Sequence, residues 1–287
     1  MILREPCLPA GWYPRKKAEI EGFLKPFPQK GAASAVMAPH AGWYYSGSCA
    51  ALAVSSLDQE SGTVAVIGGH LPKGPRGGPD TPVLIAGEDG VRTPLGIMEI
   101  DGELREEFAG RLSKGPAGRI PSSPDRYDDN TVEVLLPMAH YYFPNARLLW
   151  LRFPADISSF DAGKLLYESA AALGRRLAVI ASVDLTHYGA NYRFNPKGSG
   201  KAALDWVKNV NDAAFINAVV EGNPALVLKR AEEDRSSCSA GAVLGALGFS
   251  ASRGKQARLL NYSTSADARP QDEVPDSFVG YAAVVWE

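Results

Sequence analysis

The chain has 287 residues, of which 45% are hydrophobic and 22% charged, and this ordinary globular composition excludes wholesale disorder. Thirty basic and 32 acidic side chains leave a net charge of −2, with no block of one sign. This balance argues against nucleic acid as a principal partner, because phosphate binding needs a concentrated basic surface.

Apolar runs and amphipathic stretches alternate along the chain. Runs rich in Val, Ile, Leu and aromatic residues predict strands at residues 35–38, 63–67, 83–86, 147–153, 177–183, 258–262 and 279–286. Helical spacing or helix-forming composition predicts helices at residues 47–57, 102–112, 131–143, 159–173, 201–220, 224–232 and 239–249. The alternation predicts an α/β fold with a mainly parallel central sheet and helices on both faces.

The helix expected over residues 131–143 begins with a capping pattern. Asn130 precedes it, and an asparagine side chain can accept a hydrogen bond from an exposed backbone N–H group of the first turn. Glu133 stands where the second residue of a capping box would. We therefore predict Asn130 as the cap of this helix.

Segments rich in glycine, proline or polar residues, at 71–82, 114–126 and 266–277, are expected to be loops. None is long or uniform enough to join separate domains, and the sequence has no internal repeat. We therefore expect a single domain spanning residues 1–287.

The sequence also bears on location. No apolar stretch approaches the roughly 18 residues of a membrane helix, and residues 1–14 do not have the pattern of a secretion signal. Three cysteines, an odd number in a long chain, do not make a disulfide framework. We expect a cytoplasmic protein that does not have a membrane as its partner.

The positions of the four histidines carry the functional argument. His40, His70 and His187 each lie just beyond the carboxyl end of a predicted strand. In an open parallel sheet these ends meet at one edge, where ligand crevices form. A single histidine after a strand is commonly a surface residue, but three of four in this position favour a shared site. His140 lies in a helical stretch among aromatic residues and is expected to be structural.

The surroundings of these histidines support a site. Gly42 follows His40 by two residues and Gly69 precedes His70, so the backbone can turn tightly or approach a ligand closely there. Asp184 ends a buried strand one turn before His187, and its carboxylate is expected to orient that imidazole.

Cys238 is the cysteine best placed for chemistry. It directly precedes the helix expected at 239–249, and a helix amino terminus favours the thiolate. Cys7, near the chain start, and Cys49, within a predicted helix, are interpreted as plain buried thiols. The residues alone therefore indicate a mononuclear site of imidazoles and one thiolate at the carboxyl edge of the sheet.

Six motifs follow one another along the chain. They are RxP and AGWYP within residues 4–14, APHAGWYYSG at 38–47, GGH at 68–70, NTVEVLLP at 130–137, SVDLTHYG at 182–189, and NY and VGYAA between 261 and 283. In this series the sequence resembles the Memo family, also called AmmeMemoRadiSam system protein B. The resemblance implies a fold similar to that of the class III extradiol dioxygenases.

The resemblance also implies a ligand set. His40, His70 and Cys238 would hold one divalent or redox metal ion, with iron favoured and copper or zinc as alternatives. Two imidazoles and a thiolate suit these metals and do not suit magnesium or calcium. Three ligands also leave open positions for water or substrate.

Catalytic and pocket residues follow from the same resemblance. His187, supported by Asp184, would be the histidine that moves a proton without binding the metal. Trp12, Tyr13 and Tyr45 would line the substrate pocket, although ordinary core packing is the alternative for each of them.

Two positions depart from the family pattern. Asn130 stands where the family often has histidine, which removes a polar pocket group. Ser239 follows Cys238 where glycine is usual, which bears on the alignment of the cysteine.

Three functions remain open from the sequence. The first is a metal-dependent oxidoreductase of dioxygenase type that acts on a small aromatic or peptide-like molecule. The second is a zinc-dependent hydrolase, and the third is a non-catalytic module that binds metal or a peptide. The family association also implies a functional link to a radical-SAM protein and an AMMECR-type protein.

Overall fold

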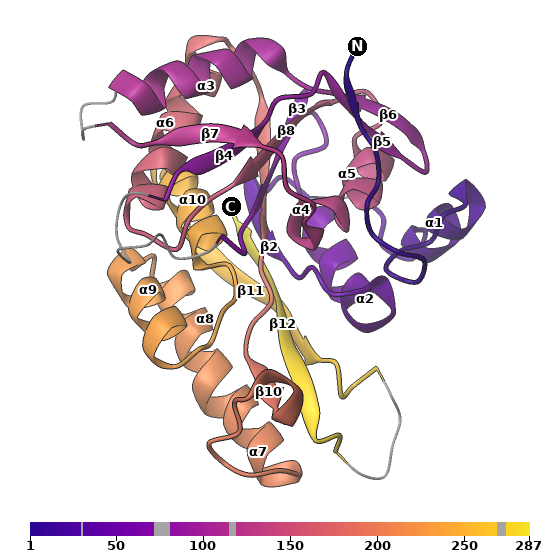
Figure 1. Cartoon of the computed structure of the whole chain (residues 1–287), viewed down its shortest axis with the longest axis vertical. Coiled ribbons are helices and arrows are strands. Elements are labelled where there is room, and N and C mark those ends of the chain that lie inside the picture. The colour runs from indigo at the N-terminus through magenta and orange to yellow at the C-terminus, as the bar shows by residue number, and fades with distance from the viewer. Residues whose placement is uncertain (30, 72–80, 115–118, 269–273) are drawn as a thin grey trace.

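The computed structural model describes residues 1–29, 31–71, 81–114, 119–268 and 274–287. Within these ranges nine strands form one sheet with helices on both faces, and three further strands form a smaller sheet (Figure 1). The predicted α/β class is confirmed. Most of the loop predicted at 71–82 lies outside the described residues, as do residues 115–118 and 269–273 of the other two predicted loops.

The elements follow most of the predicted alternation. The strand at residues 122–125 lies within the loop predicted at 114–126, and the short strands at residues 3–4, 90–93, 96–99 and 187–189 were not predicted. The strands are β1 (Leu3–Arg4), β2 (Ala35–Ala38), β3 (Thr63–Gly68), β4 (Val83–Ala86), β5 (Gly90–Thr93), β6 (Gly96–Glu99), β7 (Ser122–Asp125), β8 (Arg147–Arg152), β9 (Leu177–Ser182), β10 (His187–Gly189), β11 (Ala257–Thr264) and β12 (Ser277–Trp286). The helices are α1 (Lys17–Leu24), α2 (Trp43–Val54), α3 (Gly102–Lys114), α4 (Asn130–Glu133), α5 (Leu136–Tyr142), α6 (Ser158–Ala172), the 3₁₀ turn η1 (Ala190–Tyr192), α7 (Lys201–Trp206), the π-helical stretch η2 (Val207–Asn211), α8 (Asp212–Val220), α9 (Pro224–Glu233) and α10 (Ala240–Ala251).

The large sheet is mixed and has a parallel centre, where the sequence predicted a mainly parallel sheet. Its order is β10-β12-β2-β9-β3-β8-β4-β7, with β11 beside β12. The central strands β2, β9, β3 and β8 pair in parallel, whereas β12 pairs antiparallel with β2, β10 and β11, and β4 pairs antiparallel with β8. The parallel centre therefore supplies the common carboxyl edge that the sequence predicted.

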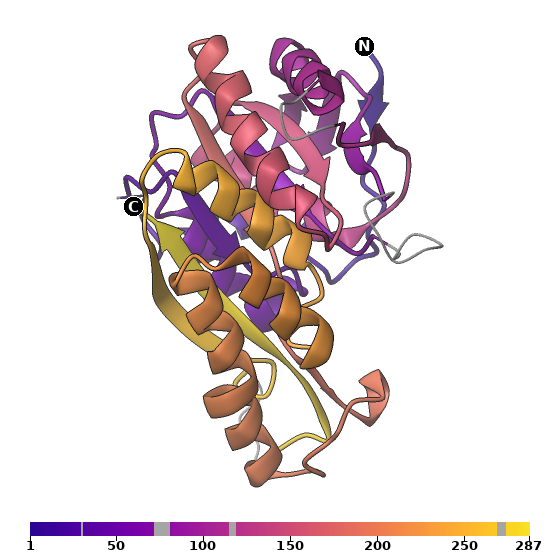
Figure 2. The same cartoon turned by 90° about the vertical axis from the view of Figure 1, so that its left-hand side faces the viewer.

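Each central strand feeds two cores because its side chains alternate between the faces of the sheet. In β3, Ala65 and Ile67 pack into the core covered by α3, α6, α8, α9 and α10, while Val64 and Val66 pack into the core covered by α1, α2, α4 and α5 (Figures 1 and 2). Burial on both faces explains why these strands are continuous apolar runs. Among the described helices, none is both long enough and apolar enough to cross a bilayer.

The helix predicted over 131–143 is split into α4 and α5, and its cap differs from the prediction. Asp129, not Asn130, is the N-cap residue, and its side chain accepts a hydrogen bond from the backbone N–H of Thr131. Asn130 is already helical and donates instead to the carbonyl oxygen of His40. Glu133 does not close a capping box, because its carboxylate accepts hydrogen bonds from the amino-terminal segment.

The helix predicted over 201–220 is present but contains the π-helical stretch η2 between α7 and α8. Such stretches are frequent at functional sites. Here it leads into Asp212, whose buried carboxylate accepts hydrogen bonds from the backbone and hydroxyl of Thr186 and from the hydroxyl of Tyr262. The long helix is thereby tied to the loop that carries His187.

Candidate metal centre

Strand register brings three predicted site residues to the same level. Strand β9 lies between β2 and β3, with Ala38 opposite Ser182 and Ile67 opposite Ala181. Two residues beyond this level, His40 and Asp184 follow β2 and β9, and His70 follows β3. Because the three strands are parallel neighbours, their side chains emerge at one edge of the sheet.

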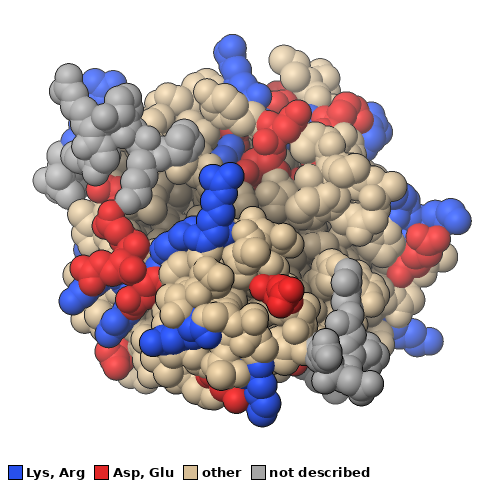
Figure 3. Space-filling model, turned by 60° about the horizontal axis from the view of Figure 1, so that its bottom comes forward, with Lys and Arg blue, Asp and Glu red and all other residues tan. Residues whose placement is uncertain are grey.

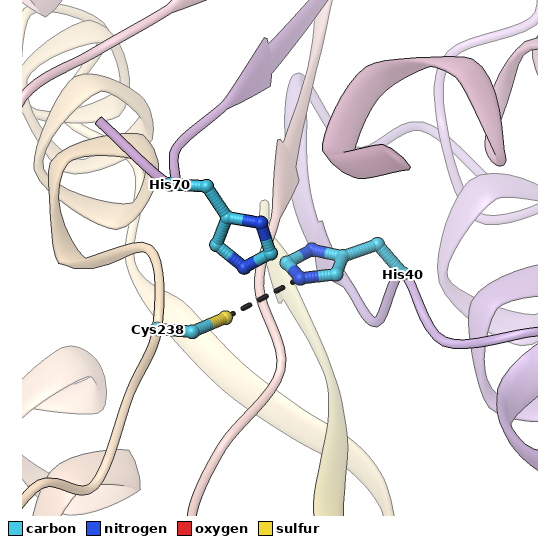
Figure 4. Close-up of side chains that lie close together, drawn as sticks. All are labelled: His40, His70 and Cys238. Atoms are coloured by element: carbon cyan, nitrogen blue, oxygen red, sulfur yellow. Dashed lines mark hydrogen bonds between the residues drawn. The ribbon is translucent and has the colours of Figure 1, made fainter. Parts of the chain in front are cut away.

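His40, His70 and Cys238 converge on one point, as Figure 4 shows. The ligand atoms that these side chains offer all lie within 4.8 Å of one another. Nε2 of His40 is 3.3 Å from Sγ of Cys238, and the two imidazole rings meet edge to face with centroids 4.9 Å apart. The structure therefore brings together the three residues predicted as ligands.

Glycines before His70 make this convergence possible. A Cβ atom at Gly68 would clash with Oγ1 of Thr131, and one at Gly69 would lie 2.5 Å from Oγ of Ser239. His70 itself adopts a left-handed backbone with φ 55°, which is uncommon for a residue other than glycine. The close approach of the β3 loop to the Cys238 loop thus depends on residues without side chains.

His40 is fully enclosed and held at two points. Its backbone N–H donates to Oδ1 of Asp184 at 2.8 Å, and its Nδ1 lies 2.9 Å from the hydroxyl of Ser182. That hydroxyl donates its single proton to the carbonyl oxygen of Thr131, so it accepts a hydrogen bond from Nδ1–H of His40. This arrangement leaves Nε2 directed at Cys238.

The carboxylate of Asp184 acts on His40 rather than on His187 as predicted. Its Oδ2 lies 3.8 Å from Nε2 of His40, in addition to the backbone hydrogen bond at Oδ1. The orienting contact on His187 comes instead from the carbonyl oxygen of Leu185, to which Nδ1 donates at 3.0 Å. The register of β2 and β9 explains the difference, because it sets Asp184 beside His40.

Cys238 lies two residues before α10, as the sequence predicted for a thiol at a helix amino terminus. Its backbone N–H donates to the carbonyl oxygen of Asp184 at 3.2 Å, which fixes the loop against β9. Burial raises the pKa of the Cys238 thiol, but the charge of His40 and the hydrogen bonds of His40 and His70 lower that pKa well below 9.0. The surroundings therefore favour the thiolate, which is the form that binds metal.

The pKa values of His40 and His70 shift upward, opposite to that of the Cys238 thiol. Burial lowers the pKa of each imidazole, but Asp184 and Cys238 raise the pKa of His40, and Asp129 and Cys238 raise that of His70 to about 10. These shifts favour a proton on the imidazoles over a proton on the thiol. A metal ion bound by the same atoms would displace the protons on the two donor nitrogens.

A cavity of about 490 Å³ opens beside the cluster. Its walls come from the amino-terminal segment, the ends of β2 and β3, the His187 loop and the β11–β12 region: Trp12, His40, Ala41, Gly42, Tyr45, His70, Asn130, Asp184, His187, Asn191, Tyr192, Ser265, Pro275, Ser277, Val279 and Tyr281. Trp12 and Tyr45, which the resemblance assigns to the substrate pocket, are among the residues that line this cavity.

Tyr13 is not a wall of this cavity, in contrast to the prediction. Its side chain is buried, its hydroxyl donates to Oε1 of Glu133 at 2.7 Å, and the guanidinium of Arg15 lies over its ring. The two adjacent aromatic side chains thus have different surroundings, because Tyr13 is held by the carboxylate while Trp12 borders the cavity.

His187 lies at the cavity but outside the three-residue cluster. Because a carbonyl oxygen only accepts hydrogen bonds, the contact with Leu185 requires a proton on Nδ1 of His187 and leaves Nε2 as an acceptor in the neutral ring. The ring also packs edge to face against Tyr192. His140 is buried in α5 with Nδ1 2.7 Å from the hydroxyl of Thr93, in agreement with the predicted structural role.

Several cavity residues were missed by the sequence reasoning. Tyr281 lies within the VGYAA motif and could have been assigned with it, whereas Asn191 and Tyr192 follow the SVDLTHYG motif. Ser265 and Ser277 flank the connection between β11 and β12, and nothing in their local sequence indicates a cavity.

On the face in Figure 3, basic and acidic side chains are interspersed rather than gathered by sign.

Comparison with known proteins agrees with the sequence motifs. A family model described as Memo-like protein matches residues 4–285. A MEMO1 family protein of Pyrococcus abyssi is 27% identical over 99% of both chains, and one of Methanosarcina barkeri is 28% identical over 99% of this chain and 100% of its own.

A solved structure supports the fold. The uncharacterized protein JW3007 of Escherichia coli K12 matches with a TM-score of 0.51 at 12% identity, covering 88% of this chain and 99% of that one. At this identity the likeness concerns the fold alone. The match of the family model over nearly the whole length is the stronger finding, and it shows that the chain belongs to the Memo-like family.

Proposed function

We propose that this protein binds one metal ion through His40, His70 and Cys238 and acts as a metal-dependent oxidoreductase of dioxygenase type on a small molecule. The observation that carries the proposal is the meeting of three ligand atoms within 4.8 Å at the wall of a cavity. The three residues come from segments far apart in the sequence.

The donor set fits such an ion. Bonds of about 2.0 Å to nitrogen and 2.3 Å to sulfur in a tetrahedral site place the donors roughly 3.5 Å apart. The separation of 3.3 Å between Nε2 of His40 and Sγ of Cys238 is close to this value. Imidazole and thiolate suit iron, copper and zinc, and iron held there would supply redox chemistry toward a small aromatic molecule and dioxygen.

The chain's own residues supply binding and proton transfer. The rings of Trp12, Tyr45 and Tyr192 offer stacking surfaces for an aromatic ligand at the cavity wall. Nε2 of His187 is the acceptor for a proton from a ligand hydroxyl, because Nδ1 is already committed to Leu185. The carboxylate of Asp184 accepts a hydrogen bond from the backbone N–H of His40 and keeps that imidazole in place.

A zinc-dependent hydrolase is the second candidate. Nitrogen and sulfur donors of this kind also hold catalytic zinc, and His187 beside the cluster could then serve as the base toward water. The oxidoreductase is preferred because the resemblance implies a fold similar to that of dioxygenases and because Trp12, Tyr45 and Tyr192 give the cavity aromatic walls.

Metal content tests the proposed site. The unaltered protein, purified without oxygen, should contain one metal ion per chain by mass spectrometry, and His40→Ala, His70→Ala and Cys238→Ser should contain almost none. Cys7→Ser is the matched control, because Cys7 is a free cysteine outside the cluster and is exposed, not buried as predicted. Equal metal in all five proteins would contradict the proposal.

Turnover then separates the candidate reactions. Oxygen uptake by the iron-loaded protein on a panel of catechols supports the oxidoreductase, and ester or amide cleavage by the zinc-loaded protein supports the hydrolase. His187→Ala should abolish either activity while retaining the metal. Binding of a peptide without turnover, unchanged in His187→Ala, would support a non-catalytic module instead.

A further inference from the structure

The carboxylate of Asp129, with 9% of its side chain exposed, stands behind His70 on the side away from the cluster. We infer that Asp129 is a positioning residue, which holds His70 so that Nε2 faces the metal site. The inference rests on the proposed metal site. Asp129 is not among the described residues that line the cavity, so it would act on the site through His70.

The contacts of Asp129 place it between two structural elements. Its Oδ2 lies 3.5 Å from Nδ1 of His70, and its Oδ1 accepts a hydrogen bond of 2.8 Å from the backbone N–H of Thr131. The hydroxyl of Thr131 also donates to Oδ1 and accepts from the backbone N–H of Gly69 at 3.2 Å. The carboxylate thus connects the start of α4 to the loop that carries His70.

Arg152 closes this arrangement from the end of β8. Its Nη2 lies 3.4 Å from Oδ2 of Asp129 and donates to the carbonyl oxygen of His70 at 3.3 Å, while its Nε donates to the carbonyl oxygen of Gly69 at 2.9 Å. Arg152 is only 4% exposed. One buried guanidinium therefore fixes both the carboxylate and the backbone of a histidine in a left-handed conformation.

The two imidazoles differ in what stands behind them. Nδ1 of His40 faces the neutral hydroxyl of Ser182, whereas Nδ1 of His70 faces an ionised carboxylate. A carboxylate behind a metal-binding imidazole fixes the ring orientation and makes the opposite nitrogen a stronger donor. Losing the carboxylate should therefore weaken metal binding more than losing the hydroxyl does.

The test compares affinities for Co²⁺ and Zn²⁺ alone, measured by competition with a chelator. Asp129→Asn should weaken binding by about 10- to 100-fold. Asparagine keeps an acceptor for Thr131 N–H, so the cap survives while the charge is lost. Asp128→Asn, at the exposed neighbouring carboxylate, should bind as the unaltered protein does, and Ser182→Ala should lose less than Asp129→Asn.

A second readout separates positioning from general support of the fold. In the zinc-loaded protein, ¹⁵N NMR of the histidine rings should find a protected proton on Nδ1 of His70, and Asp129→Asn should speed its exchange with water. Unchanged affinity in Asp129→Asn would overturn the inference, and so would weaker binding with an unchanged Nδ1 proton. Absence of metal from the unaltered protein would instead contradict the proposed function.

Asp129→Ser provides a second variant should Asp129→Asn fail to fold, because serine is also a good N-cap residue and removes the carboxylate. Circular dichroism melts establish that each variant is folded before its affinity is measured. The same reduction of affinity and the same faster proton exchange are expected.

Discussion

The centre and the rim of the candidate site are built differently. In the centre, His40, Asp184 and His70 follow three adjacent parallel strands at one level, so the ladder of the sheet sets their positions. The rim comes from irregular segments that carry Trp12, Tyr192 and the β11–β12 connection. The centre therefore depends on backbone register, and the rim depends on side-chain contacts that fasten individual loops.

Two buried carboxylates illustrate how the rim is held. Asp212 fastens the His187 loop through the backbone and hydroxyl of Thr186. Glu133 fastens the amino-terminal segment through the backbone N–H groups of Cys7 and Leu8 and the hydroxyl of Tyr13. Each can be altered without touching the three-residue cluster, so variants at these positions can separate the two parts of the site.

The largest expected effect concerns Asp212 and the pH. Burial raises the pKa of this carboxyl from 3.8 to about 6 in the folded protein, although hydrogen bonds from Thr186 and Tyr262 oppose the rise. The folded state thus holds the proton more tightly than the unfolded state, so this group stabilises the fold at low pH and the contribution is lost as pH rises from about 4 to about 6. The difference corresponds to roughly 3 kcal/mol.

Asp212→Asn should remove this part of the pH dependence of unfolding, measured by denaturant titration between about pH 4 and pH 7. Asp205→Asn, at a partly exposed carboxylate on the same helical stretch, is the control and should leave the pH dependence unchanged. An identical slope for the unaltered protein and Asp212→Asn would contradict the prediction.

The next largest effect is expected for a glycine substitution beside the metal centre. Gly69→Ala would bring a Cβ atom within 2.9 Å of the Cα of Ser239, so the loop that carries Cys238 must move. We expect a loss of about 2 kcal/mol in unfolding free energy, typical of overpacking. Metal affinity should also fall by at least about 10-fold, because the donor geometry is disturbed.

Gly62→Ala is the matched control for that variant, since no heavy atom lies within 4 Å of the added Cβ. Denaturant unfolding and chelator competition measure the two quantities. Unchanged metal affinity in Gly69→Ala would show that the cluster tolerates displacement of Ser239. It would contradict the dependence of the metal centre on backbone position.

The smallest effect is expected at the amino-terminal wall. Glu133→Gln replaces one acceptor oxygen by a donor facing the N–H groups of Cys7 and Leu8, at a cost of roughly 1 kcal/mol. Hydrogen exchange of residues 7–13, followed by mass spectrometry, should become faster, while metal affinity stays near that of the unaltered protein. Glu19→Gln, at an exposed glutamate, should change neither quantity.

The sequence predicted the centre better than the rim, for a physical reason. His40, His70 and Cys238 could be found because strand ends and a helix start are visible in local patterns, and the family motifs then indicated their common role. Asp129 was missed because Asn130 is an equally good cap by composition, and only the tertiary position of His70 distinguishes the two.

The residues at the rim of the site could not be predicted from local sequence patterns in the same way. A shared motif indicates which segments lie near the cavity but not which side chains reach it, since adjacent Trp12 and Tyr13 belong to the same motif and only Trp12 lines the cavity. Ser277 reaches the cavity through the register of β12 against β10, which no local pattern specifies. The π-helical stretch before Asp212 was likewise hidden inside a continuous helical pattern.

The position of β9 between β2 and β3 has a consequence for how the site can vary. A slip of one residue in any of these strands would carry its side chain about 3.3 Å along the sheet and turn it to the opposite face. The alignment of His40 and His70 is therefore shared among all the backbone hydrogen bonds of three strands. Changes elsewhere in the molecule can reshape the cavity entrance freely, provided that this alignment is kept.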